Sequence, residues 1–141
     1  FRLTRFIERH IDGAKAELAA RNKPLDNAHL VSLLGFGFWN GLLGPGYRRL
    51  HEMRLWRFPL RRAFVHLSSA TRPMVHDDVD KLRMLRNRIA HHEAIFIRDH
   101  EGDHERILRV AGWLYADLPD WIAHHSRCAE IIAQKPVSHT F

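Results

Sequence analysis

The feature that most restricts the fold of this chain is an uncharged stretch at residues 29–47, which reads HLVSLLGFGFWNGLLGPGY. A stretch without Asp, Glu, Lys or Arg is stable only inside a protein core or a membrane, because exposing its apolar side chains to water is costly. Asn40, Pro45 and five glycines interrupt it, and its unbroken apolar pieces are too short to cross a bilayer. We therefore predict a buried core helix that ends near Gly44-Pro45-Gly46.

Two glycines within this stretch, Gly37 and Gly41, are four residues apart and therefore lie on one side of the predicted helix. Because they lack a Cβ, they leave room for another helix to pack closely there. A membrane-associated protein that inserts residues Leu30 to Leu43 is the less favoured alternative, and we expect no contact with a membrane.

The composition is that of one ordinary globular domain. The 141 residues are 45% hydrophobic and 27% charged, which fits a single domain over residues 1–141 and argues against disorder. A lone cysteine, Cys128, cannot form an intrachain disulfide and is typical of a reducing, cytoplasmic location. The first residue is Phe1 rather than Met, and we expect the native chain to begin further upstream.

Arginine gives the chain its positive charge. The net charge is +6, and all but four of the Lys and Arg residues are arginines. A guanidinium group can bind a phosphate through two parallel hydrogen bonds, so this composition favours nucleic acid as a partner. Charge alone does not establish the partner, because many soluble proteins are basic.

Helical periodicity extends over most of the remaining chain. Apolar residues recur at helical spacing in residues 1–21, and Pro24 ends this predicted helix. Asp26 or Asn27 is a suitable N-cap for the uncharged helix that follows. No segment alternates as a strand does, so the sequence predicts an all-α fold of about five or six helices.

The second half of the chain contains four further predicted helices, separated by prolines and capping residues. They are a short helix over residues 60–71 closed by Pro73, a long helix opened by His76-Asp77-Asp78 that runs to about His92, a helix capped by Asp103 that runs through Leu118, and a last helix after Pro119.

Residues 47–62 are rich in arginine and contain one acidic residue, Glu52. Tyr47, Trp56 and Phe58 are interleaved with the arginines. One interpretation is a surface whose arginines follow a phosphate backbone while the aromatic rings stack on bases. The other is a solvated helical face whose aromatic side chains point into the core. The sequence favours neither interpretation.

The predicted long helix carries a polar motif beside an apolar stripe. Asn87 and His91 are four residues apart and are neighbours on a polar flank. Arg86 lies at the border of this flank, from which its long side chain reaches the His91 side. The stripe, at about 100° per residue, consists of Val79, Leu82, Leu85 and Ile89.

An imidazole, a guanidinium and an amide at this spacing suffice for cleavage of RNA by its own 2′-hydroxyl. A histidine, whose ordinary pKa is near neutral, can take the 2′ proton or protonate the leaving 5′ oxygen. Arg86 can stabilise charge on the phosphorane oxygens. Asn87 can hold the imidazole in one tautomer or bind a phosphate oxygen. This chemistry needs no metal and no external nucleophile.

Spacing alone is not specific, because Arg5/His10, Arg61/His66 and Arg98/His104 have similar separations. The string LRMLRNRIAHHEAIF, however, resembles the signature of the HEPN superfamily, in which an arginine, usually followed by a polar residue, precedes a histidine by four to six positions. The string LLGFGFWNGLLG, followed by basic and aromatic residues, is similar to the upstream pattern of the Abi-like (abortive infection) family. This resemblance covers residues 26–121.

The resemblance implies that Arg86, Asn87 and His91 are the catalytic residues, with His92 as a second histidine that satisfies the spacing. It implies a HEPN-like helical bundle, a homodimer whose two motifs face each other, and a metal-independent endoribonuclease that acts as a toxin-like effector of bacterial antiviral defence. RNA and a protein or small-RNA antitoxin are the expected partners. The candidate substrate-binding residues are Arg83, Arg88 and His92 near the motif, and Arg48 and Arg49 in the basic segment.

Two groups of residues have the composition of a metal site, and neither is convincing. Asp77, Asp78 and Asp80 are explained as acidic residues at a helix start. His100 and His104 have the spacing of a ligand pair but lack a third ligand. We therefore expect no metal and no cofactor.

A function of a different class also fits the sequence. The chain is then a non-catalytic helical module that binds RNA or a protein partner through its basic surface, as many HEPN domains are inactive or only bind RNA.

Overall fold

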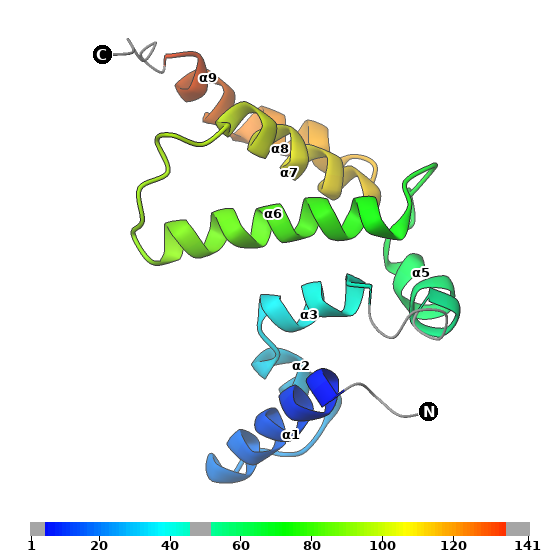
Figure 1. Cartoon of the computed structure of the whole chain (residues 1–141). Coiled ribbons are helices and arrows are strands. Elements are labelled where there is room, and N and C mark those ends of the chain that lie inside the picture. Colours follow the sequence, from blue (N-terminus) through cyan, green and yellow to red (C-terminus); the bar gives the residue numbers. More distant parts are fainter. Residues whose placement is uncertain (1–4, 46–51, 135–141) are drawn as a thin grey trace.

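The computed structural model describes residues 5–45 and 52–134 (Figure 1). These residues are helical and contain no strand, which confirms the predicted all-α class. In chain order the helices are α1 (Arg5–Ala20), α2 (Asn27–Leu33), α3 (Phe36–Leu43), the π-helical segment η1 (Glu52–Leu60), α5 (Arg61–Ala63), α6 (Arg72–Ala90), α7 (His100–Leu114), α8 (Leu118–His125) and α9 (Cys128–Ala133). No helix in the described ranges is long and apolar enough to cross a membrane.

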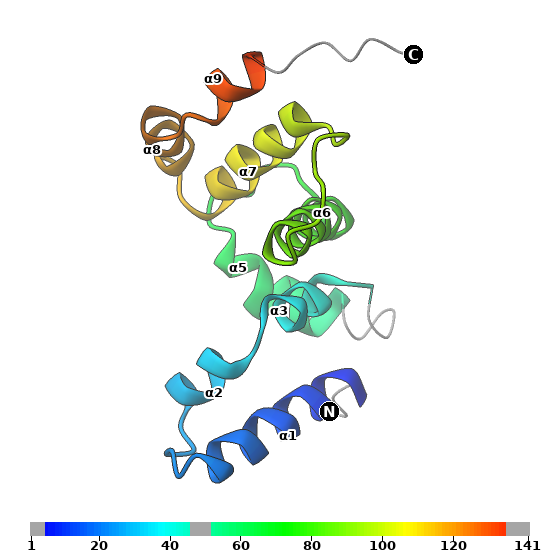
Figure 2. The ribbon, with the colours of Figure 1, turned by 90° about the vertical axis from the view of Figure 1, so that its left-hand side faces the viewer.

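The long helix α6 is the centre of the molecule. Figures 1 and 2 both show α6 between α3 on one side and α7 on the other, and α7 returns antiparallel to α6. Helices α1 and α2 lie beyond α3, whereas α8 and α9 lie beyond α7. The helices therefore form an elongated stack in which α6 has neighbours on two opposite sides.

The uncharged stretch does not form the single core helix that the sequence predicted. Leu34 and Gly35 have extended backbone, and they divide the stretch into α2 and α3. Asp26 caps α2 as predicted, because its carboxylate accepts the backbone N–H of His29 at 2.9 Å. That hydrogen bond is also the main reason why the pKa of Asp26 is lowered. Gly44 follows the end of α3, as expected.

Burial also differs between the two parts of this stretch. Helix α2 has no buried residue, whereas Phe38, Asn40 and Leu43 of α3 are buried. The prediction of close packing is correct at Gly41, where a Cβ would lie 2.6 Å from the ring of Phe6 in α1. The prediction is wrong at Gly37, where a Cβ would meet nothing within 4 Å.

The main hydrophobic core lies where η1, α6 and α7 meet. Its buried residues are Leu43, Trp56, Leu67, Val75, Val79 and Trp113, and Leu60, Phe64, Ala70 and Val110 pack against them. Val75 has no exposed surface, and burying a side chain of this size contributes about 1.5–3 kcal/mol. This core therefore fixes the first half of α6.

Helix α6 begins earlier than predicted. Thr71 precedes its first residue, and Pro73 lies in the first turn instead of closing a preceding helix. Proline is well accommodated there, since first-turn N–H groups have no partner within the helix. The predicted helix over residues 60–71 is correspondingly short, with only α5 and the end of η1 helical.

Helix α7 also begins earlier than predicted. Its N-cap is Asp99, whose carboxylate accepts the backbone N–H of Gly102 at 2.9 Å. Asp103, the predicted cap, is buried inside the helix and serves a different purpose. Helix α7 ends at Leu114, before the predicted Leu118, and α8 carries Pro119 in its first turn.

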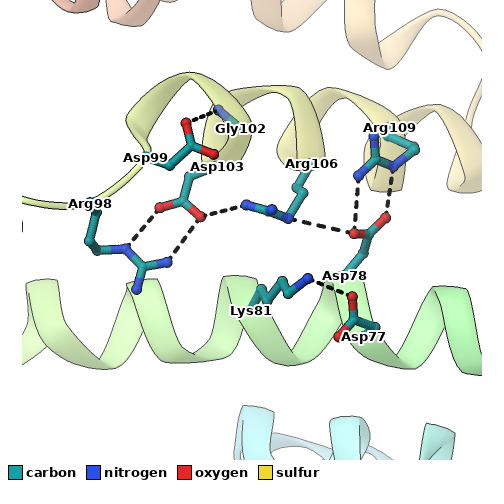
Figure 3. Close-up of polar contacts among 9 residues, drawn as sticks. All are labelled: Asp77, Asp78, Lys81, Arg98, Asp99, Gly102, Asp103, Arg106 and Arg109. Carbon is teal, nitrogen blue, oxygen red and sulfur yellow. Dashed lines mark hydrogen bonds and ion pairs between the residues drawn. The ribbon is translucent and has the colours of Figure 1, made fainter.

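A chain of ion pairs joins α6 to α7, and we call it the α6–α7 seam (Figure 3). Asp78 of α6 accepts two hydrogen bonds from Arg109 of α7, at 2.7 and 3.0 Å. Asp103 accepts two from Arg98, at 2.9 and 3.0 Å. Arg106 lies between the two carboxylates, 3.1 Å from Asp103 and 3.7 Å from Asp78. The seam thus alternates positive and negative groups.

Hydrogen bonding to these carboxylates raises the pKa of two of the seam arginines. Asp103 is the main cause for Arg98, and Asp78 is the main cause for Arg109. A basic group whose pKa is raised by folding stabilises the fold at every pH below its ordinary pKa. We therefore expect Arg98 and Arg109 to stay charged throughout the range in which proteins are handled.

Candidate functional site

His91 and His92 have different backbone conformations at the end of α6. The helix ends at Ala90, so the prediction that it runs to about His92 is wrong. His91 caps the helix, and its backbone N–H donates to the carbonyl of Asn87 at 2.9 Å. This last helical hydrogen bond keeps His91 on the Asn87 side of α6, as the spacing predicted. His91 is exposed.

His92 has left the helix. Its φ of 55° lies in the left-handed region, where residues other than glycine are uncommon. The backbone N–H of His92 donates to Ile89 at 3.1 Å, and that of Glu93 donates to Arg88 at 2.8 Å. This pair of bonds is a Schellman motif, which usually has glycine at the left-handed position. His92 therefore does not continue the helix beyond His91.

Arg88 takes part in closing the helix end. Its side chain donates to the carbonyl of Ala94 at 3.3 Å and lies 3.9 Å from the carboxylate of Glu93. Glu93 is thus an ion-pair partner of Arg88. Arg88, a candidate substrate-binding residue, is thus already committed to the turn that follows the motif.

Arg86 and Asn87 are in direct contact. The Nη1 of Arg86 donates to Oδ1 of Asn87 at 3.3 Å, which is a long hydrogen bond. Arg86 is exposed and Asn87 is half-buried. In the described part of the chain the Asn87 side chain thus contacts the guanidinium of Arg86 and makes no hydrogen bond to the His91 ring.

Arg83 belongs to a polar cluster between α3 and α6. Its Nε donates to Asp80 at 2.8 Å, and the same carboxylate oxygen accepts the side-chain N–H of Asn40 at 2.7 Å. Arg83 is therefore paired with a carboxylate, unlike Arg86. If Arg83 binds substrate, it does so while it also pairs with Asp80.

The core side of α6 becomes exposed before the helix ends. Arg86 follows Val75 by eleven residues and Val79 by seven, spacings that return to the same side of an α-helix. The two valines are buried, but Arg86 is exposed, and Ile89 of the predicted apolar stripe is 54% exposed. Figure 1 shows the reason, since the last turns of α6 extend past α3.

The segment after the motif is anchored from its far end. Arg98 lies immediately before the N-cap of α7 and holds the buried Asp103 with two hydrogen bonds. Between the motif and this anchor, Phe96 and Ile97 are 69% and 77% exposed. The segment that follows the motif in sequence therefore exposes two large apolar side chains.

The aromatic residues of the basic segment, residues 47–62, differ in burial. Arg48, Arg49 and Tyr47 lie outside the described residues. Trp56 is buried in the core, as one interpretation predicted, whereas Phe58 is 62% exposed, as the other predicted. The second interpretation is thus confirmed for Trp56, and the stacking of Phe58 on bases stays a prediction.

No metal-binding cluster of three or more His, Cys, Asp or Glu side chains occurs among the described residues. Our explanation of Asp77 and Asp78 as residues at a helix start is wrong, because α6 begins at Arg72. Instead, Asp77 pairs with Lys81 at 2.7 Å and Asp78 pairs with Arg109. Cys128, which is free, is exposed.

Comparisons with protein-family models, with curated proteins and with solved structures find no match for this chain. The assignment to the Abi-like HEPN family therefore stays a prediction, which depends on the two sequence motifs. What the chain can do has to be argued from its own residues.

The sequence did not reveal the seam. Asp78 and Arg109 are 31 residues apart, and neither spacing nor composition pairs them. One signal was available: Arg106 and Arg109 are three apart on α7, so they share one side of a helix and require acidic partners if that side is buried.

Proposed function

We propose that this chain is a metal-independent RNA endonuclease of the HEPN type, which acts as a toxin-like effector in bacterial antiviral defence. One observation carries the proposal: Arg86, Asn87 and His91 lie together on the uncovered end of α6, and Arg86 contacts no carboxylate in the described structure. Its charge is therefore available to a phosphate, unlike that of Arg83.

The proposed reaction is an attack by the RNA's own 2′-hydroxyl. An imidazole removes the 2′ proton, the 2′ oxygen forms a bond to phosphorus, and the bond from phosphorus to the 5′ oxygen breaks. A second imidazole, protonated, gives its proton to that leaving oxygen. The products are a 2′,3′-cyclic phosphate and a 5′-hydroxyl. Arg86, held by Asn87, stabilises the negative charge that develops on the phosphorane oxygens.

A homodimer would supply the second imidazole. One chain contributes one His91, whereas the reaction needs both a base and an acid. Ile89 in the last turn of α6, and Phe96 and Ile97 in the segment after it, are exposed and support an apolar contact with a second copy, because large exposed apolar side chains are typical of interfaces. A two-fold contact there would bring two copies of Arg86 and His91 into one cleft.

The test measures RNA cleavage by purified variants with unchanged thermal stability. Removal of His91 or Arg86 (H91A, R86A) should reduce cleavage by about a hundredfold or more. Two controls match these changes: His92→Ala removes the neighbouring histidine, and Arg127→Ala removes an exposed arginine that pairs with Glu130 on α9. Both controls should keep most of the activity. Unchanged cleavage by H91A or R86A at equal protein concentration refutes the assignment.

Product chemistry and metal dependence provide a second test. Cleavage should continue in EDTA and leave a 2′,3′-cyclic phosphate on the upstream fragment. A magnesium requirement or a 3′-hydroxyl product excludes this mechanism. RNA binding without cleavage would instead favour the non-catalytic binding module.

The shared site has its own test. Mixing wild type with an excess of H91A should reduce the activity per wild-type chain, because mixed dimers contain one imidazole. Light scattering gives the mass of the assembly. A monomer with full cleavage excludes the shared site but leaves the roles of the residues open to the variant test.

A further inference from the structure

The segment from η1 through α5 has two chemically opposite sides. Trp56, Leu60 and Phe64 follow one another at intervals of four residues and pack in the main core. The rings of Trp56 and Phe64 lie 6.1 Å apart. Residues four or five apart share one side of a helix that contains π-helical turns, so these three define its inner side.

The outer side of the segment carries Arg57, Phe58, Arg61 and Arg62, and we call it the η1–α5 surface. Arg57 and Arg61 are four residues apart, as are Phe58 and Arg62. All four side chains are exposed. Three cations and one aromatic ring thus gather on two consecutive helical turns.

The positive charge of this surface is not compensated. The sequence contains no acidic residue between Glu52 and Asp77. Within the described residues, none of the three guanidinium groups of Arg57, Arg61 and Arg62 makes an ion pair or hydrogen bond. Their mutual repulsion favours a polyanion as the ligand.

Phe58 adds an apolar platform to this charge. At 62% exposure its ring is in water, which offers it no favourable partner. A ring flanked by arginines is the combination that binds single-stranded nucleic acid, since unpaired bases stack on the ring while the guanidinium groups contact phosphates. A duplex hides its base faces and would use only the charges.

We propose that the η1–α5 surface binds single-stranded nucleic acid, with Phe58 stacking on a base and Arg57, Arg61 and Arg62 contacting the backbone phosphates. This inference does not depend on the proposed nuclease activity. If that activity exists, the surface is a second contact for the RNA at the far end of α6 from the motif. The 19 residues of α6 span about 28 Å, so one RNA must be several nucleotides long to reach both.

The test is the affinity of the whole chain for a labelled single-stranded oligonucleotide, measured by fluorescence anisotropy at several salt concentrations. A 2′-O-methyl RNA probe is used because it lacks the 2′-hydroxyl nucleophile and cannot be cut by the proposed reaction. A DNA strand and an RNA duplex of the same sequence are the comparison probes.

Substitution of the arginines and substitution of the ring should weaken binding in different ways. Replacement of Arg57, Arg61 and Arg62 by glutamine should make the plot of log affinity against log salt concentration less steep by about 2. Each lost phosphate contact on a single strand accounts for about 0.7 of this change. Phe58→Leu keeps an apolar side chain but loses the aromatic face, so it should weaken binding roughly tenfold without changing the slope. Phe58→Trp should restore it.

A matched control separates the surface from net charge. Arg5 and Arg9 of α1, and Arg21 directly after it, are also exposed, and replacing them by glutamine removes the same charge elsewhere. An equal loss of affinity in this control and in the Arg57, Arg61 and Arg62 variant refutes the proposal. Wild-type affinity in Phe58→Leu, or equally tight binding of the duplex, also refutes it.

The two single-stranded probes distinguish the source of the ligand. Preference for the RNA probe supports an RNA surface, and equal affinity for DNA supports a surface that reads only bases and phosphates. If RNA is never cleaved but these losses of binding are observed, the nuclease proposal fails while the η1–α5 surface stands.

Discussion

The arginines of the α6–α7 seam and those of the η1–α5 surface carry the same charge in opposite surroundings. Arg98, Arg106 and Arg109 contact the buried carboxylates of Asp78 and Asp103. The three arginines of η1 and α5 project into water and contact no carboxylate among the described residues. Arginine therefore neutralises buried carboxylates in one region and is available to ligands in the other.

Arg86 belongs with the second group, although it lies on the helix that carries Asp78. The difference arises along α6 itself, because its first half is covered by α3 and α7 and its last turn is not. A net charge of +6 thus says little about binding until the arginines that pair with carboxylates are distinguished from those that do not.

The largest expected effect breaks the seam. Asp103→Ala should lower the free energy of unfolding by about 3 kcal/mol, because it removes the buried carboxylate that both Arg98 and Arg106 contact. Urea unfolding followed by circular dichroism measures the loss. The control is Asp77→Ala, whose exposed pair with Lys81 should contribute about 0.5 kcal/mol or less. Similar losses in both variants would contradict the distinction drawn here.

A smaller effect tests the geometry of the seam. Arg109→Lys keeps the charge but loses one of the two hydrogen bonds to Asp78, so we expect a loss of about 1.5 kcal/mol. The same change at Arg57, which has no carboxylate partner in the described structure, should have almost no effect on unfolding. If Arg109→Lys also left the free energy of unfolding unchanged, the seam would depend on charge alone and not on hydrogen-bond geometry.

A substitution at the end of α6 that carries the motif should stabilise the protein instead of destabilising it. His92→Gly should raise the free energy of unfolding by about 1 kcal/mol, because glycine adopts the left-handed conformation without the Cβ clash. Asn22, which also has a positive φ, should gain less from the same replacement since asparagine tolerates this region. A destabilised His92→Gly protein would show that the His92 side chain has a structural partner in solution.

The smallest expected effect concerns the η1–α5 surface. Replacing Arg57, Arg61 and Arg62 singly by glutamine should change the free energy of unfolding by less than about 0.5 kcal/mol each, because exposed side chains without partners contribute little. Thermal and urea unfolding of each variant measure this. A loss near that of Asp103→Ala would mean that these arginines belong to the fold rather than to a binding surface.

Local features of the sequence determined the helical class and much of the predicted site. The apolar spacing predicted α1, and the capping preference of Asp26 predicted the start of α2, since both depend only on nearby residues. Asn87 and His91 share a side of α6 for the same reason. Prolines were harder to interpret, because Pro73 fits the first turn of a helix as well as the end of one.

Only the tertiary structure decided which side chains are buried and which charges are neutralised. The seam joins residues 31 positions apart, and α3, which follows the break at Gly35, packs Phe38 against Phe6 of α1. Trp56 is buried and Phe58 is exposed although both are aromatic, because the core lies on one side of η1. Periodicity fixes the side of a helix on which a residue lies, but what covers that side depends on segments distant in sequence, and the energy of a charge or an apolar ring depends on that cover.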